Sequence, residues 1–576
     1  MELNSPPLSN SPTDTASRSW GVAGWSIAVA AFAIGFWQFP LQAVGPTLDH
    51  LPGDVIDARL NNYILEHGYR YLNGQDPTFW DVGMFYPTPR VVAYSDAHIG
   101  MLPVYASARS LGCTMERAFQ IWFLVPFALN YGAAILACRR LNATAFTAVV
   151  AAYFFAFGIN QATSVTLHAQ LGPRFLVPFA LVLGREWLFR PSTGKFAALA
   201  ACVVGQAYLT IYIGYFLALV LLLQSLAIAG IERRGVAWTP LVRPGFRVWG
   251  VRTLLALLAA WALMPLAIPY AVAGHDHFMP GPGDVRGTHP TPDSWIYSSR
   301  LSIHAPWTDE LHPPPDPEQV TAVCEKQLFP GLIPCFALLG GVLAFIAWPE
   351  IRRGYAAVAG ATVLVCLITI TNVSGFTAYE PLLYLPGAGG IRVIARFVHV
   401  LAFPWGFLVG ESLQRLANRV PRFRTAAIFL MLVGVIADQW VVPTGGSAYW
   451  PSHRFPVAQA EARRERMIEA IRTHPSPRLV YVFPGANESE WLPLQVDAMI
   501  ASQHLDLPTV NGWSGHPPWN WDYFADCHSL LEWLERKRGA SDDVLAGLVL
   551  LGEPTPAYDE REIALRKKFL VRPLPR

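Results

Sequence analysis

Charged residues are scarce in this sequence, and so are cysteines. Only 15% of the 576 residues are charged, 53% are hydrophobic, and the formal net charge is +2. So apolar a composition excludes an ordinary soluble enzyme, and the small net charge gives no indication of nucleic acid as a partner. The seven cysteines are scattered without a CxxC or Cys/His ligand spacing, which argues against a structural zinc site or a disulfide scaffold. We therefore expect the lipid bilayer to be the main solvent of the chain.

Nucleotide-binding signatures and tandem repeats are missing as well. The sequence contains no GxGxxG dinucleotide turn and no phosphate-cradling P-loop. The stretch GWSG at 512–515 resembles a nucleophile elbow but lacks the second glycine at the required place. ATP-dependent and nicotinamide-dependent chemistry are therefore poor explanations of this chain.

Long apolar runs dominate what is present. A transmembrane helix needs about 20 apolar residues, and such runs recur near 20–41, 118–138, 144–163, 173–190, 253–273, 329–348, 355–372, 393–412 and 425–442. The run 196–230 is nearly twice as long and has TIYIGY at its middle, so we expect two helices with a tight turn there. The expected fold class is a polytopic α-helical membrane protein with about eleven transmembrane helices.

Arg and Lys predict the orientation, because short loops rich in them stay cytoplasmic. These residues gather in every second connection, such as that after Arg139 and Arg140. The alternate connections are poor in them for their length: 42–117, 164–172, 274–328 and 373–392. We therefore expect a cytoplasmic N-terminus and an extracytoplasmic, periplasmic-type location for the alternate loops and the C-terminal segment.

Composition divides the chain into three segments. Residues 1–19, rich in Pro, Ser and Thr, are expected to form a disordered cytoplasmic tail. Residues 20–442 are expected to form the transmembrane domain, with a large first outer loop at 42–117. Residues 443–576 are expected to form a small extracytoplasmic α/β domain, because strand-like and helix-like patterns alternate there. The strands are expected at 478–483, 507–513 and 545–551, and the helices at 456–473 and 528–538.

Ionisable residues are concentrated just after the first expected span, in HLPGDVIDARLNNYILEH at 50–67. If 54–67 is helical, Asp54 and Asp57 lie on one face at i,i+3, with Asn61 one turn later. Two converging carboxylates suit a general base or a cation site. The acids of an interfacial helix can equally be solvated and without function, and the spacing alone does not separate these two interpretations.

The first outer loop carries a second polar pair, Asp96 and His98. With Asp54 or Asp57 this pair could ligate a divalent metal, although two ligands at i,i+2 often occur by chance. Arg174, at the start of an expected span, is typical of a snorkelling anchor. Further candidates on the outer side are His168, Glu325 and Lys326.

The stretch LPGAGGIRVIARF at 385–397 leads into another apolar run. Arg392, Arg396 and His399 recur there at i,i+4 and i,i+3, and charged groups inside a membrane are costly enough to indicate function. After a Gly-rich loop, they suit a clamp for a phosphate or pyrophosphate headgroup. Interfacial snorkelling explains Arg392 better than the deeper Arg396, so we favour the clamp.

These features together resemble the GT-C superfamily of integral membrane glycosyltransferases. The motifs GDVIDARLNNYILEH, FYPTPRVVAYSD, EKQLFPG and LPGAGGIRVIARF are similar to motifs in bacterial members, and the likeness covers 20 to about 442. The resemblance implies a sugar donor linked to polyprenyl phosphate. It also implies a first-loop Asp as base, with Asp54 the best match and Asp57 the second, and Arg392 and Arg396 on the donor phosphate. Some members use a divalent metal, and because the loop has no clear DxD, metal dependence stays open.

The sequence thus predicts a glycosyltransferase of the bacterial inner membrane that modifies an envelope glycan, lipid or protein from the outer face. It is expected to contact membrane lipids and no nucleic acid. One alternative is a lipid or glycan transporter or flippase, but such proteins usually carry broken helices in matching halves, which the sequence does not display. The other is a non-enzymatic envelope-assembly scaffold that binds glycan through the Trp-rich stretch 511–524, although such aromatic clusters are more often core.

Overall fold

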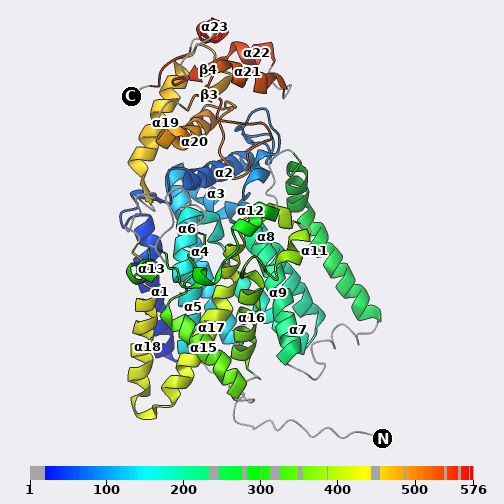
Figure 1. Cartoon of the computed structure of the whole chain (residues 1–576), viewed down its shortest axis with the longest axis vertical. Coiled ribbons are helices and arrows are strands. Elements are labelled where there is room, and N and C mark those ends of the chain that lie inside the picture. The colour runs from blue at the N-terminus through cyan, green and yellow to red at the C-terminus, as the bar shows by residue number, and fades with distance from the viewer. Residues whose placement is uncertain are drawn as a thin grey trace.

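The computed structural model describes most of the chain, and helices dominate it. The described residues are 20–231, 246–275, 282–299, 301–311, 325–347, 354–385, 387–442, 454–484, 488–536, 541–554, 560–569 and 571–574. A long helical bundle occupies one part of the molecule. A smaller unit with short strands, formed mainly by residues 454–574 and called the outer unit below, is stacked on one end of it (Figure 1). The expected tail at 1–19 lies outside the described residues.

The bundle contains helices that are long and apolar enough to cross a membrane. In the described residues six qualify by length and composition: Val22–Val44, Met115–Arg140, Ala145–Thr166, Ile211–Ile231, Phe246–Ala273 and Ile394–Asn418. Two shorter apolar helices accompany them, Leu332–Ala344 and Tyr355–Ile370. This architecture is that of a multi-pass membrane protein, and the number of eleven spans stays a prediction.

The bundle elements follow the expected apolar runs. They are α1 (Val22–Phe36), η1 (Trp37–Leu41), α4 (Met115–Arg140), α5 (Ala145–Phe157), α6 (Ile159–Leu167), α7 (Val177–Phe189), α8 (Thr193–Leu209), α9 (Ile211–Ile231), α11 (Phe246–Ala273), α15 (Leu332–Ala347), α16 (Tyr355–Ile370), α17 (Val398–Asn418) and α18 (Arg424–Asp438). The double-length run is divided at Thr210, whose extended backbone separates α8 from α9, as predicted. The side chains of Thr114 and Thr144 cap the N-termini of α4 and α5 by accepting backbone N–H groups.

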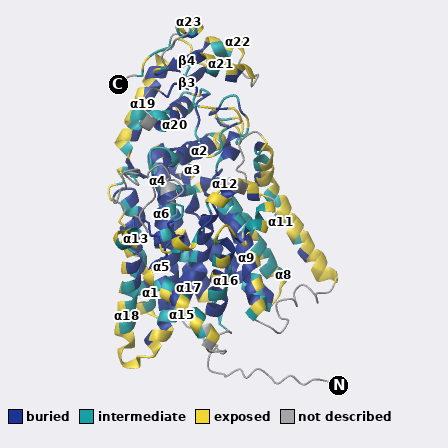
Figure 2. Cartoon of the chain, in the orientation of Figure 1, coloured by how far each residue is buried: buried dark blue, intermediate teal, exposed yellow. Residues whose placement is uncertain are grey.

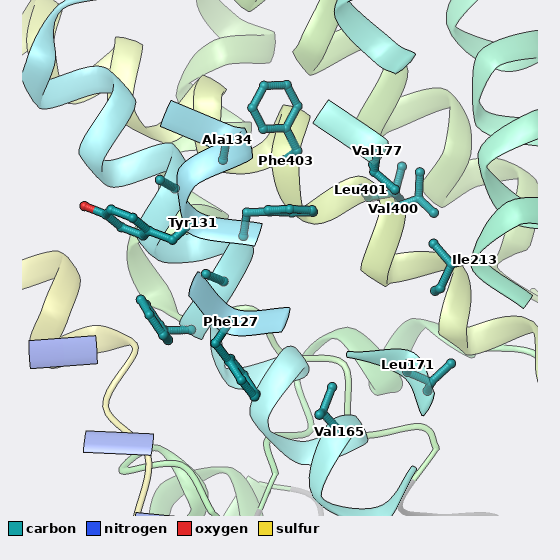
Figure 3. Close-up of a cluster of buried hydrophobic side chains, with 14 of the residues drawn as sticks. Phe127, Tyr131, Ala134, Val165, Leu171, Val177, Ile213, Val400, Leu401 and Phe403 are labelled. Carbon is teal, nitrogen blue, oxygen red and sulfur yellow. The ribbon is translucent and has the colours of Figure 1, made fainter. Parts of the chain in front are cut away.

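Close packing of α17 on α5 fixes the centre of the bundle. A Cβ added at Gly406 would lie 3.1 Å from the Ala151 backbone, and one at Gly410 would lie 2.6 Å from the carbonyl oxygen of Thr147. Small residues four positions apart allow membrane helices to approach this closely. Figure 3 shows part of the buried hydrophobic cluster to which both helices contribute, including Phe127, Tyr131, Val177, Val400 and Phe403. The middle of α17 therefore lies directly against the backbone of α5.

The outer surface of the bundle is apolar. Exposed residues line α11 and much of α18, whereas the middle of the bundle is buried (Figure 2). Large apolar side chains on α11 include Leu257, at 62% exposure, and Trp261, at 69%. Such surfaces suit contact with lipid tails.

Short elements form the outer unit and the loops below it. From the first loop come β1 (His50–Pro52), α2 (Asp57–Leu72), η2 (Val91–Tyr94), η3 (Ile99–Met101) and α3 (Leu102–Ser110). The C-terminal segment adds β2 (Arg454–Pro456), α19 (Val457–Arg472), β3 (Leu479–Val482), α20 (Glu488–His504), α21 (Cys527–Arg536), α22 (Asp542–Ala546), β4 (Leu548–Leu551) and α23 (Glu560–Lys568). Other connections contain η4 (Ala169–Leu171), α12 (Pro282–Gly287), η6 (Pro292–Trp295), α13 (Ala305–Leu311), η9 (Glu380–Tyr384), η10 (Ala388–Gly390), η11 (Ile394–Phe397) and η12 (Pro421–Phe423).

Backbone hydrogen bonds join the first loop to the C-terminal segment. Strands β3 and β4 pair in parallel, and β1 pairs antiparallel with β2. The segment around Thr509 lies beside β3, where Val480 donates its N–H to Pro508 at 3.1 Å. On its other side, Thr509 donates to the carbonyl of Gly83 at 2.7 Å, and Phe85 donates to Asn511 at 3.1 Å. The first loop therefore extends the hydrogen-bonded layer of the C-terminal segment.

Candidate functional site

Asp54 and Asp57 both lie at the N-terminal end of α2, but their side chains have different surroundings. Asp54 Oδ1 accepts backbone N–H groups of Ile56 at 3.0 Å, Asp57 at 2.6 Å and Ala58 at 3.3 Å. Asp54 is thus the side chain that caps the first turn of α2. Burial, together with the nearby charge of Asp57, raises the pKa of Asp54 to about 6 against the opposing effect of these hydrogen bonds.

Gly53 brings this end of α2 against the bundle. Its φ of +92° is a conformation that suits glycine, and an added Cβ would lie 2.6 Å from the carbonyl oxygen of Thr166 in α6. The chain can pass this close to α6 only without a side chain. Because α6 ends at Leu167, the approach places Asp57 beside His168.

Four ionisable side chains from four separate segments form a continuous chain of contacts. His168 Nδ1 lies 3.3 Å from Asp57 Oδ2, and His168 Nε2 lies 3.1 Å from Glu325 Oε1. Arg396 Nη2 then donates to Glu325 Oε1 at 2.6 Å. The Arg396 side chain is 7% exposed and that of Asp57 is 28% exposed. This series of contacts therefore leads from a buried cation to a carboxylate that solvent can reach.

The surroundings of the Asp57 and Glu325 carboxylates favour their ionised forms. Burial alone would raise the pKa of Asp57, but the hydrogen bond and charge of His168 outweigh it, with further help from Trp513 and Arg396, and hold the pKa below its usual value. Burial of Glu325 is likewise outweighed by Arg396 and His168, so its pKa is also lowered.

His168 responds to the same contacts in the opposite sense. Burial and the Arg396 charge lower its pKa, but its bonds to Asp57 and Glu325 raise it above the usual 6.5. The site therefore holds two ionised carboxylates next to a permanent guanidinium cation and an imidazole that gains a proton readily.

The expected phosphate clamp is distributed over different places. Arg396 is buried, with its guanidinium over the Tyr212 ring at 5.1 Å. His399 is buried deeper in α17, where its Nδ1 lies 3.1 Å from Gln161 Oε1. Arg392 is exposed, and its guanidinium lies 4.0 Å from the position that a Cβ on Gly515 would take. The described contacts therefore do not bring these three side chains together on one point.

Arg174 corrects an expectation, because its side chain is fully buried and does not snorkel to the interface. Its Nη2 donates to the carbonyl of Phe155 at 2.7 Å, and its Nη1 lies 3.5 Å from His399 Nδ1. The guanidinium also stacks 4.8 Å from the Phe155 ring. Arg174 thus supports the position of His399 from inside the bundle.

Asp96 lies near Arg396 and, among the described residues, is not part of a group of side chains that could bind a metal ion. Burial raises its pKa to about 7, while the backbone N–H of Ile211, the charge of Arg396 and the N–H of His98 oppose the rise. The buried ring of His98 lies edge-on to Trp122, with ring centroids 5.2 Å apart. Across the described ranges, no group of three or more His, Cys, Asp and Glu is arranged to hold a metal ion. Lys326 is half-buried and is not one of the four side chains in this chain of contacts.

Three residues that contact Asp57, Asn61 and Arg396 were not identified from the sequence, namely Trp513, Gln170 and Tyr212. Trp513 Nε1 donates to Asp57 Oδ1 at 2.7 Å, and Asn61 Nδ2 donates to Gln170 Oε1 at 3.1 Å beside it. The third, Tyr212, lies under Arg396. The only signal in the sequence was the Trp-rich stretch 511–524, which suggested sugar stacking or core and not a carboxylate partner.

Comparison with known proteins gives structural likenesses only. No family model matches the sequence, and neither does any curated protein. Among solved structures, the chain is similar to the arabinofuranosyltransferase AftD from Mycobacteria at 16% identity and a TM-score of 0.49, covering 82% of this chain and 30% of that chain. It is also similar to the archaeal oligosaccharyltransferase AglB from Archaeoglobus fulgidus in complex with an inhibitory peptide and a dolichol-phosphate.

The likeness to this AglB complex has 11% identity and a TM-score of 0.49, covering 89% of this chain and 68% of the AglB chain. The apo form of the Archaeoglobus fulgidus oligosaccharyltransferase gives 12% identity, a TM-score of 0.47 and the same coverage. The chain thus spans less than a third of the AftD chain, and at these identities the likeness concerns the arrangement of elements alone. The solved structures named here are an arabinofuranosyltransferase and an oligosaccharyltransferase.

Proposed function

We propose that the chain is a membrane glycosyltransferase that moves a sugar from a polyprenyl-phosphate donor to a hydroxyl of an envelope glycan, lipid or protein. The observation that carries the proposal is the contact chain from Asp57 through His168 and Glu325 to Arg396. It holds an ionised carboxylate and a buried cation at the end of the bundle that meets the outer unit. Transfer from a lipid-linked sugar phosphate needs both, a base for the acceptor and a positive charge for the leaving phosphate.

The proposed reaction is a single displacement at the anomeric carbon. The acceptor oxygen bonds to that carbon as the bond between the carbon and the phosphate oxygen breaks. Asp57 takes the proton of the acceptor hydroxyl, and polyprenyl phosphate leaves with the bonding electron pair. Arg396 offsets the negative charge that develops on the phosphate. No metal is needed to balance these steps.

Asp57 is preferred over Asp54 as the base, although the family resemblance points first to Asp54. Asp54 Oδ1 is engaged by three backbone N–H groups, a contact set that serves the helix end. Asp57 lies in the contact chain instead, and among the described residues each of its oxygens has one side-chain partner, Trp513 or His168. A carboxylate oxygen has two lone pairs, so Asp57 keeps acceptor capacity for a substrate proton.

Arg396 suits the donor phosphate because it has donors to spare. Nη2 is engaged by Glu325, whereas Nε has no hydrogen-bond partner among the residues that the structure describes. A phosphate oxygen bound there would satisfy a buried donor that is otherwise costly to leave unpaired. Exposed Arg392 is proposed to attract the anionic donor at the mouth of the site. His399, which is buried deeper in α17, is proposed to support the site from inside the bundle.

The test compares two carboxylate variants in nanodiscs. Wild type, Asp57→Asn and Asp54→Asn are incubated with radiolabelled polyprenyl-phosphate sugars and envelope extract. Wild type should transfer label, and Asp57→Asn should lose about 10²- to 10⁴-fold in kcat, the usual contribution of a general base, while it still binds donor. Asp54→Asn should stay close to wild type, because Asn caps helices as well as Asp does.

Each contrary outcome has a separate meaning. Passage of donor across sealed vesicles without covalent transfer would replace the transferase by a transporter. Absence of both transfer and donor binding in wild type would favour the scaffold. Equal turnover by wild type and Asp57→Asn would remove Asp57 from the role of base.

A further inference from the structure

A tryptophan from the far end of the sequence contacts the carboxylate proposed as the base. The indole Nε1–H of Trp513 donates to Asp57 Oδ1 at 2.7 Å, a contact between residues 456 positions apart. Trp513 is half-buried, so its ring closes part of the outer side of the site. A donor at this distance is short for N–H···O and is of the kind that charged acceptors form.

The backbone on both sides of Trp513 is pinned to the first loop. A Cβ on Gly512 would lie 2.2 Å from the Phe85 ring, so the chain packs there without room for a side chain. On the other side, Ser514 Oγ donates to the carbonyl of Tyr94 at 2.7 Å. Both Gly512 and Ser514 are buried. The indole is therefore fixed in place before any substrate arrives.

The two oxygens of Asp57 have different partners. Oδ1 accepts from the neutral indole, and Oδ2 faces His168 Nδ1 at 3.3 Å. Contacts on both oxygens restrict rotation of the carboxylate and point its remaining lone pairs in defined directions. The indole hydrogen bond is also one of the causes that hold the pKa of Asp57 low.

We propose that Trp513 is a positioning residue, which holds the Asp57 carboxylate in the orientation needed to accept the proton of the acceptor hydroxyl. The C-terminal segment then completes an active centre that the first loop and the bundle begin. This inference rests on the proposed function, because it assigns Asp57 a reaction to perform. It makes no claim that Trp513 itself touches the substrate.

The test uses Trp513→Phe in the full-length protein, with Trp521→Phe as the matched control. Trp521 lies in the same stretch and donates its indole N–H to the carbonyl of Val510 at 3.1 Å, away from Asp57. Both variants lose one indole hydrogen bond, and only one of them loses a contact to the carboxylate. Thermal unfolding of both in nanodiscs shows whether the folded state is retained.

Trp513→Phe is expected to lower kcat by about 10- to 100-fold, as loss of a hydrogen bond to a charged group predicts, with the donor KM changed less than about twofold. The acidic limb of the pH profile should move to higher pH, because a carboxylate without its donor gains a proton more readily. Trp521→Phe should leave both quantities unchanged. Trp513→His keeps a ring N–H and should recover part of kcat relative to Trp513→Phe.

Three outcomes would overturn the inference. Trp513→Phe could turn over like wild type, or lose kcat with an unmoved acidic limb, or match the loss of Trp521→Phe, and each would leave Trp513 a structural residue while the proposed function stands. Wild type that transfers no sugar from any donor would overturn the proposed function, and the inference with it. If Trp513→Phe does not fold, Trp513→Leu, which also lacks the indole N–H, is compared with wild type by the same pH limb.

Discussion

A buried ion-pair network joins α2 of the first loop to α19 and α20 of the C-terminal segment, and it makes a quantitative prediction. Arg59 donates to Asp497 at 2.6 Å, and Arg463 donates to the other oxygen of Asp497 at 2.7 Å. The Arg59 and Asp497 side chains are 2% and 4% exposed. Arg463 is 12% exposed and also bonds Glu490 at 3.0 Å. The three central groups therefore depend on one another for charge balance.

Asp497→Asn should destabilise the protein far more than Arg59→Met does. Removal of the Asp497 charge leaves the Arg59 guanidinium buried without its anion, and breaking a buried pair in this way typically costs about 3–5 kcal/mol. Removal of Arg59 still leaves Asp497 paired with Arg463, so the loss should be less than half as large. For a folding unit of about 150–250 residues, a loss of about 3–5 kcal/mol corresponds to a fall of roughly 6–20 °C in the thermal midpoint.

The assay is thermal unfolding in nanodiscs, followed by tryptophan fluorescence. The double variant Arg59→Met with Asp497→Asn completes a mutant cycle, and its loss should be clearly smaller than the sum of the two single losses. Glu532→Gln serves as control, because its pair with Arg536 is exposed and should contribute about 0–1 kcal/mol. Equal losses for the two single variants, or additive losses in the double variant, would refute the reasoning.

Two further predictions concern the site. Glu325→Gln should lower stability by about 3 kcal/mol, because buried Arg396 loses its carboxylate, and added polyprenyl phosphate should raise the thermal midpoint more in this variant than in wild type. Neutral polyprenol is the control for that measurement, and an equal effect of the two lipids would contradict it. Asp96 has a pKa of about 7 when folded against 3.8 ordinarily, so the stability it contributes below pH 3.8 is lost as pH rises through about 7, by about 4 kcal/mol at most. The thermal midpoint of wild type should therefore fall across this range more than that of Asp96→Asn, and parallel curves would contradict this assignment.

Local patterns in the sequence predict the bundle well, because the bilayer requires a long apolar helix wherever the chain crosses it. The break at Thr210 was predicted from the double length of its run together with the TIYIGY stretch at its middle. A helix over 54–67 was a premise of the sequence-based prediction, and α2 begins at Asp57. The strands β3 and β4 were also expected, because they are the short apolar runs LVYV and LVLL. Local patterns indicate where these elements lie, whereas the pairing of β3 with β4 joins residues 69 positions apart.

The pairing of side chains in the site was not predictable in the same way. Spacing places Asp54 and Asp57 on one helical face if both are helical, but α2 begins at Asp57, and Asp54 precedes the helix and caps it. The approach of Gly53 to Thr166, which sets Asp57 beside His168, depends on how two distant segments pack. Nothing in the local sequence of Trp513 indicates that it meets a residue 456 positions away.

The arrangement of the expected phosphate clamp of Arg392, Arg396 and His399 could also not be predicted correctly from local spacing. The spacing of Arg392, Arg396 and His399 puts them on one face only if the helix starts at or before Arg392. In the structure α17 starts at Val398, preceded by the 3₁₀ turn η11 from Ile394 to Phe397. Arg392 precedes both elements and turns outward to Gly515, whereas Arg396 points inward to Glu325. The backbone at Ile391 and Val393 is not helical, so Arg392 and Arg396 are not related by helical spacing. One arginine therefore faces the bundle and the other faces the C-terminal segment, and of the two only Arg396 belongs to the contact chain of the proposed base.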